Sequence, residues 1–107
     1  MQQFLFLCSR NRLRSPTAEQ LFAGRPGIST DSAGLALDAD TPLDAEQIRC
    51  ADVIVVMERA HRSKLLQRFG PQLKGKKLVC LDIADNYSFM QPELVALLEK
   101  RMTPYLR

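Results

Sequence analysis

The chain has 107 residues, of which 46% are hydrophobic and 25% charged, and its net charge is +3. This length predicts one domain, residues 1–107, and the ordinary composition excludes a largely disordered chain. The basic residues form no stripe among the five Phe and two Tyr, and no apolar run approaches the ~18 residues of a membrane span, so we expect neither nucleic acid nor a membrane as a partner.

The three cysteines, Cys8, Cys50 and Cys80, are too few for a disulfide framework and show no zinc-binding spacing. We therefore expect at least one free thiol, no metal and no cofactor. The N-terminus shows no signal-peptide pattern, which makes a cytoplasmic location the default expectation. Nothing in the sequence indicates the oligomeric state.

The first half of the chain alternates between strand and helix signals. Residues 3–7 are continuously apolar, which is typical of a strand buried on both faces of a parallel sheet. Ser15 and Pro16 predict an N-cap and a first helical residue, and Gly24 with Pro26 ends that helix. A short strand is expected at residues 28–32.

The next elements continue the alternation. Thr41, Pro42 and Asp44 indicate a cap, a first-turn proline and a capping-box acid, and so predict a short helix that ends near residue 49. "DVIVVM", residues 52–57, predicts the third strand. Residues 59–69 are expected to form a helix.

The last elements are a fourth strand at residues 77–81 and a helix that begins at Pro92. This order predicts an α/β fold with three layers: a four-stranded parallel sheet with helices on both faces, similar to flavodoxin. In such folds ligands bind beyond the carboxyl ends of the strands. The segment that follows the first strand is therefore the first place to look for a site.

That segment, "CSRNRLRSP", places three arginines behind one thiol, and no acidic residue occurs before Glu19. A loop between a buried strand and a helix start gathers backbone N–H groups that bind anions and stabilise a thiolate. Cys8 would then be a nucleophile, and the fork of donors on Arg14 suits two oxygens of a tetrahedral anion. The alternative is that Cys8 is a small buried residue and the arginines form a solvated turn.

The same segment resembles the phosphate-binding loop of the low-molecular-weight protein tyrosine phosphatases, with cysteine, five residues, arginine, serine and proline in order. "SAG" at 32–34, "VIVVM" followed by an acid at 58, and an aspartate-containing loop after the fourth strand also follow the family's order. The resemblance covers nearly the whole chain, and it implies the fold of that family.

The resemblance implies roles for individual residues. Cys8 would be the nucleophile, Arg14 the clamp on the phosphoryl oxygens and Ser15 a hydroxyl donor to the thiolate. Asn11 would hold a left-handed backbone turn, with Ser32 as its hydrogen-bonding support. The implied phosphate-binding residues are Cys8, Ser9, Arg10, Asn11, Arg12, Leu13, Arg14 and Ser15.

The chain also departs from the family's pattern. Arg10 stands where the family has glycine, and the stretch between "SAG" and the third strand is short and lacks the family's histidine-containing segment. The choice between phosphotyrosine and other phosphate esters therefore stays open. Arg10 and Arg12 are either contacts for an acidic flank of the substrate or solvated turn residues.

A general acid is expected in "LDIADNYSF", the loop after the fourth strand, because the leaving oxygen must be protonated. The family's acid precedes proline and an aromatic residue, so "DNY" favours Asp85, with Asp82 as the second candidate; both could also be turn formers. Tyr87 and Phe89 either line the cleft or pack against the last helix. His61 is predicted to lie on a helix surface.

The sequence therefore predicts a phosphomonoester hydrolase, most specifically a protein tyrosine phosphatase with a phosphocysteine intermediate. A phosphorylated protein or a small aryl phosphate would be its substrate. One alternative is arsenate reductase, which would require Cys50 or Cys80 as a second thiol. Another is a phosphate- or phosphoprotein-binding module without catalysis.

Overall fold

The computed structural model describes residues 1–106, and its centre is a sheet of four parallel strands in the order β2-β1-β3-β4. The strands are β1 (Gln2–Cys8), β2 (Ile28–Gly34), β3 (Val53–Val56) and β4 (Lys77–Cys80). The predicted sheet is therefore confirmed, and each strand end lies within two residues of its predicted position.

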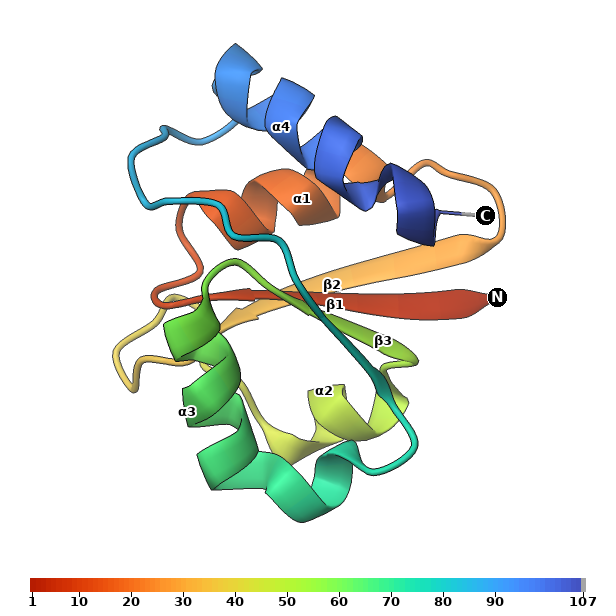
Figure 1. The fold of residues 1–107 in the computed structure, drawn as a ribbon, viewed down its shortest axis with the longest axis vertical. Helices are drawn as coiled ribbons and strands as arrows, with labels where there is room; N and C mark the ends of the chain where they lie inside the picture. Colours follow the sequence, from red (N-terminus) through yellow and green to blue (C-terminus); the bar gives the residue numbers. More distant parts are fainter. Residues whose placement is uncertain (107) are drawn as a thin grey trace.

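The helices form the two outer layers. Their bounds are Arg14–Phe22 for α1, Ala45–Cys50 for α2, Arg59–Phe69 for α3 and Pro92–Met102 for α4, and the short 3-10 turns η1 and η2 span Gly70–Leu73 and Thr103–Tyr105. Figure 1 shows α1 and α4 on one face of the sheet and α2 and α3 on the other, which confirms the three-layer architecture. None of these helices is long and apolar enough to cross a membrane.

The apolar run of β1 forms two cores because successive side chains of a strand point to opposite faces. Phe4, Phe6 and Cys8 pack with residues of α1 and α4. Leu5 and Leu7 pack with residues of α2 and α3. All five side chains are at most 4% exposed, so β1 is buried on both faces and its carboxyl end is held rigidly in the molecule.

The path of the chain places a crevice at that end of β1. From β1 the chain passes through α1 to β2 on one side, and it then passes through α2 to β3 on the other side of β1. The connections after β1 and β3 therefore diverge to opposite faces of the sheet. Such a switch point is where open α/β sheets bind ligands.

The start of α1 differs from the prediction. The helix begins at Arg14, and the residue before it, Leu13, makes no side-chain cap hydrogen bond. Ser15 is not the N-cap, because its hydroxyl lies 2.9 Å from the sulfur of Cys8 and is used there. The serine therefore contributes to the loop after β1 and not to capping the helix.

The start of α2 also differs. Thr41 does not cap the helix; Asp44 is the N-cap, and it accepts a hydrogen bond from the backbone N–H of Gln47. The Gln47 side chain accepts one in return from the Asp44 backbone, which completes a capping box. The predicted acid is correct, but its position is the cap itself.

Candidate active site

The loop after β1 turns its carbonyl groups away from the crevice. The carbonyls of residues 8–10 accept hydrogen bonds at 2.9, 2.8 and 3.0 Å from the N–H groups of Leu35, Ala36 and Asp40. In a trans peptide the N–H points opposite to the carbonyl, so the N–H groups of residues 9–11 point to the other side. Within residues 1–106 these three N–H groups have no hydrogen-bond partner, and they form a cradle for an anion.

Gly34 allows this loop to lie so close to β2. A Cβ atom at Gly34 would lie 2.7 Å from the carbonyl oxygen of Ser9 and 2.4 Å from the Cβ of Ala39. Both distances are shorter than van der Waals contact, so only glycine fits here. The "SAG" sequence at 32–34 thus has a physical role, since its glycine lets the segment after β2 hold the loop.

Asn11 and Ser15 form a short chain of hydrogen bonds to Cys8. Asn11 has a φ of 58°, which confirms the predicted left-handed backbone. Its side-chain amide donates to the Ser15 oxygen at 2.9 Å, so the proton of that hydroxyl is free to point to the Cys8 sulfur, also at 2.9 Å. A hydroxyl that donates to sulfur stabilises a thiolate.

Ser32 does not support Asn11, and this prediction is wrong. Its hydroxyl donates instead to the carboxylate of Glu19 on α1. The reason is its position along the strand: Ser32 lies opposite Phe6 in the sheet, two residues before the end of β1. Its side chain therefore packs below the loop and does not reach it.

Arg14 is 2% exposed and is held by two parts of the chain, the segment after β3 and the loop after β4. Its Nη1 donates to Oε2 of Glu58 at 2.7 Å and to the carbonyl of Ile83 at 2.6 Å. Its Nε lies 3.6 Å from Oδ1 of Asp85, and this buried donor has no hydrogen-bond partner within residues 1–106. The guanidinium is thus fixed in place through Nη1, while its Nε–H is still available to a ligand.

The structure separates the two candidate acids. Asp85 lies beside Arg14 and contributes to the wall of the pocket. Asp82 has a φ of 54° and lies near Arg59, at 3.7 Å, and the Cys80 thiol, at 3.6 Å. The pocket has a volume of about 420 Å³ and is lined by Cys8, Ser9, Arg10, Arg12, Leu13, Arg14 and Asp85. Only Asp85 therefore shares a pocket with Cys8.

The two arginines at the rim of the pocket are paired with carboxylates. Arg10 contacts Asp38 at 2.7 Å, and Arg12 contacts Asp40 at 3.1 Å. All four side chains are more than half exposed. Both arginines are therefore solvated residues, which is one of the two predicted alternatives. They also form ion pairs with the segment after β2.

The aromatic residues of the last loop do not reach this pocket. Tyr87 packs against the core beneath α4, which is one of the two predicted alternatives. Phe89 is 47% exposed. The residues that line the pocket include Arg10, Arg12 and Leu13 and neither of these two aromatic residues.

His61 is buried, so its predicted place on a helix surface is wrong. It lies in the first turn of α3 and is 3% exposed. Its Nε2 lies 3.1 Å from the hydroxyl of Ser9 and 3.6 Å from Oε2 of Glu58. Burial, together with the charge of Arg14, lowers the pKa of His61 below its ordinary value of 6.5.

A weak signal in the sequence could have found His61. It stands four residues before Leu65, the only buried apolar residue of α3, and residues four apart share one face of a helix. The histidine therefore lies on the buried face. Glu58, which sequence reasoning noted only as an acid after the third strand, is the second residue whose contacts emerge from the structure.

No cluster of three or more His, Cys, Asp or Glu side chains that could hold a metal ion lies within residues 1–106. The polar groups of the pocket are backbone N–H groups, a thiol, one hydroxyl, three guanidinium groups and one carboxylate. This set suits a tetrahedral oxyanion beneath which a sulfur nucleophile lies, with an acid at the rim.

Solved structures of low-molecular-weight protein tyrosine phosphatases share the fold of this protein over nearly the whole chain. No family model matches the sequence, and a search of curated proteins also gives no match. The likeness is therefore one of structure, at low sequence identity.

Three of these structures show the extent of the likeness. Tyrosine phosphatase AmsI of Erwinia amylovora is 26% identical, with a TM-score of 0.76 over 97% of this chain and 90% of that one. The arginine phosphatase YwlE of Geobacillus stearothermophilus is 23% identical, with a TM-score of 0.78 over 99% and 93%. The phosphatase SP-PTP of Streptococcus pyogenes is 14% identical, with a TM-score of 0.79 over 99% and 91%.

Proposed function

We propose that the protein is a phosphomonoester hydrolase of the protein tyrosine phosphatase type, acting through a phosphocysteine. The observation that carries this proposal is the loop after β1, where outward carbonyls leave the N–H groups of residues 9–11 free around the sulfur of Cys8. Arg14 adds a fixed guanidinium beside them. The phosphatase fold of the chain gives independent support.

In the first step the Cys8 thiolate attacks phosphorus in line with the ester oxygen. The S–P bond forms while the P–O ester bond breaks, and the Asp85 carboxyl donates its proton to the leaving oxygen. The loop N–H groups and Arg14 bind the equatorial oxygens throughout. Because the carbonyls hold the loop, these donors need no rearrangement as the transition state forms.

In the second step water attacks the phosphocysteine, and the Asp85 carboxylate takes a proton from it. The S–P bond breaks, inorganic phosphate leaves, and the sulfur returns as a thiolate that Ser15 stabilises by hydrogen bonding. Glu58 keeps Arg14 in position in both steps through their 2.7 Å ion pair.

Hydrolysis of p-nitrophenyl phosphate at neutral pH, with a chelator present, tests the proposal. Cys8→Ser is expected to lower kcat by about 10⁴–10⁶-fold, the range seen when a catalytic nucleophile or its base is removed. Cys80→Ser is the matched control and should keep full activity, because this thiol lies outside the pocket. Equal rates for wild type and Cys8→Ser would contradict the proposal.

The proposed substrate is a phosphorylated protein or a small aryl phosphate. Because AmsI is a tyrosine phosphatase and YwlE an arginine phosphatase, peptides with phosphotyrosine and with phosphoarginine should be compared directly. We expect phosphotyrosine to be the better substrate, because the carboxyl of Asp85 at the pocket supports general acid catalysis toward a phenolic leaving oxygen. A higher kcat/KM for phosphoarginine would reassign the substrate and leave the nucleophile unchanged.

The positions of the other cysteines do not support arsenate reduction. Cys80 packs against the opposite core from Cys8, so their side chains lie on different faces of the sheet. Cys50 ends α2, just before β3 begins, and therefore lies at the other end of the strands. Asp85 at the pocket argues in turn against a binding module without catalysis.

A further inference from the structure

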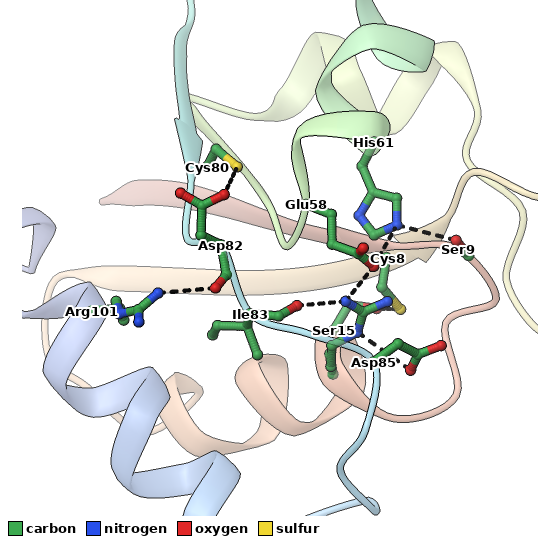
Figure 2. A network of polar contacts seen from close by, with 11 residues as sticks. Cys8, Ser9, Ser15, Glu58, His61, Cys80, Asp82, Ile83, Asp85 and Arg101 are labelled. Carbon is green, nitrogen blue, oxygen red and sulfur yellow. Dashed lines mark hydrogen bonds and ion pairs between the residues drawn. The ribbon is translucent and has the colours of Figure 1, made fainter.

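His61 has no part in the steps above, yet it is one of the few buried polar side chains of the described chain. Figure 2 shows one edge of its ring turned toward Ser9 and Glu58. Its Nε2 lies 3.1 Å from the Ser9 hydroxyl and 3.6 Å from Oε2 of Glu58. Its Nδ1 is buried and has no hydrogen-bond partner within residues 1–106.

These contacts decide which ring nitrogen carries the proton. A proton on Nδ1 would be a buried donor without an acceptor, which is strongly unfavourable. A proton on Nε2 faces two acceptors, the Ser9 oxygen and the Glu58 carboxylate. Burial, and next the charge of Arg14, lower the pKa of His61, which agrees with a neutral ring. His61 therefore donates from Nε2 to Ser9.

The direction of this bond sets the direction of the next one. Once the Ser9 oxygen accepts a hydrogen bond from His61, its own proton must point elsewhere. Ser9 follows Cys8 directly and lines the pocket. The hydroxyl proton is thus available to an anion bound in the pocket, beside the free N–H groups of the loop.

We propose that Ser9 is a substrate-contacting residue whose hydroxyl donates a hydrogen bond to a phosphoryl oxygen, and that His61 is the positioning residue that orients this hydroxyl. The inference rests on the proposed function and deepens it. The backbone of residues 9–11 would bind any tetrahedral oxyanion, and Ser9 adds a side-chain donor whose direction is fixed from α3. Two elements 52 residues apart in the chain are coupled in this way.

The first test compares wild type, Ser9→Ala and Ser9→Thr in two measurements. One is the inhibition constant of orthovanadate, and the other is the affinity for inorganic phosphate. Ser9→Ala should lower the affinity for both anions by about tenfold or more, which corresponds to the loss of one hydrogen bond to a charged group. Ser9→Thr keeps the hydroxyl and should restore most of the affinity. Unchanged affinity in Ser9→Ala would overturn the proposal.

The second test is a double-mutant cycle with His61→Leu. If His61 acts only through the Ser9 hydroxyl, His61→Leu weakens vanadate inhibition as Ser9→Ala does, and the double variant is no weaker than either single one. Ser63→Ala, an exposed serine of α3, is the matched control and should bind as wild type does. Fully additive losses would show that His61 does not work through Ser9.

Urea denaturation of each variant separates binding from folding, since only variants that are folded at the assay temperature enter the cycle. Calorimetric titration with phosphate requires no turnover. If wild type binds phosphate but hydrolyses no ester, the proposed hydrolase fails, while the same cycle measured on calorimetric phosphate binding still decides the role of Ser9. If wild type hydrolyses esters and Ser9→Ala binds phosphate equally well, only this inference fails.

Discussion

Two loops supply the two halves of the proposed site, and the structure holds them very differently. The loop after β1 is bonded to the segment after β2 through the carbonyls of residues 8–10, and its Asn11 and Arg14 side chains are buried. In the loop after β4, no backbone hydrogen bond involves residues 84–87 within the described part of the chain, and the Asp85 side chain is 61% exposed.

The backbone of the loop after β4 is hydrogen-bonded to other elements only near its ends. Ile83 is fully buried, donates its N–H to the carbonyl of Met57 at 2.8 Å and accepts a bond from Arg14. At the far end, the N–H of Met90 donates to the hydroxyl of Thr17 at 3.0 Å. The loop after β1 is therefore preorganised for anion binding. The loop after β4, which carries the proposed proton donor, makes few backbone hydrogen bonds and can adjust its position.

The largest effect that separates the loops is expected from Asp85→Asn. It should lower kcat by about 10²–10⁴-fold for phenyl phosphate, because general acid catalysis is lost. The loss should be smaller for p-nitrophenyl phosphate, whose leaving group needs less protonation, and vanadate inhibition should hardly change. Asp82→Asn is the matched control; a loss as large as that of Asp85→Asn would assign the acid to Asp82.

Arg14→Lys is expected to affect binding and turnover together. Lysine keeps the charge but has no planar fork, so the contacts to Glu58, Ile83 and the phosphoryl oxygens cannot all be made. We expect vanadate to bind about 10- to 100-fold more weakly. The measurement is competitive inhibition of aryl phosphate hydrolysis, and wild-type inhibition would contradict the role of the guanidinium.

Gly34→Ala tests whether the rigidity of the loop after β1 depends on its contact with β2. The new Cβ would overlap the carbonyl of Ser9, so we expect a loss of about 1–3 kcal/mol in the free energy of unfolding, as in other overpacked sites, together with weaker vanadate inhibition. Gly24→Ala is the control, since a Cβ there meets nothing within 4 Å. Urea denaturation measures the free energy of unfolding of both variants.

The smallest effect concerns His61 and pH. Because the pKa of His61 is lowered in the folded protein, the unfolded chain binds the proton more tightly. The contribution of His61 to the free energy of unfolding is complete above the ordinary pKa of 6.5. It is lost as the pH falls from that value toward the lower pKa of His61 in the folded protein. His61→Gln should therefore reduce the difference in urea midpoint between pH 7.5 and about pH 5.5. An unchanged difference would contradict the assignment.

Local signals predicted most of the fold. The apolar run of residues 3–7, the "DVIVVM" segment and Pro92 each act within a few positions of the chain, and the structure has β1, β3 and α4 there. The order of the elements then fixed the parallel sheet. The loop after β1 was predictable for the same reason, since one continuous segment carries the thiol, Asn11 and Arg14.

The wrong predictions depended on contacts between distant residues. The local pattern of Ser15 and Pro16 predicts a helix cap, but the Ser15 hydroxyl lies at the sulfur of Cys8, which is the place that the family resemblance implies for it. Ser32 was assigned to the loop because the register of β2 against β1 was unknown. His61 was placed at the surface because its partner, Ser9, lies in another element of the fold.

The separation of Cys8 from the other thiols has a consequence for damage by peroxide. Cys8 and Cys80 lie on strands that both neighbour β3, so about 10 Å of sheet separates them, more than a disulfide can span. If peroxide converts Cys8 to a sulfenic acid, no thiol within residues 1–106 can resolve it. Recovery then depends on a separate reductant that enters the pocket before further oxidation makes the loss permanent.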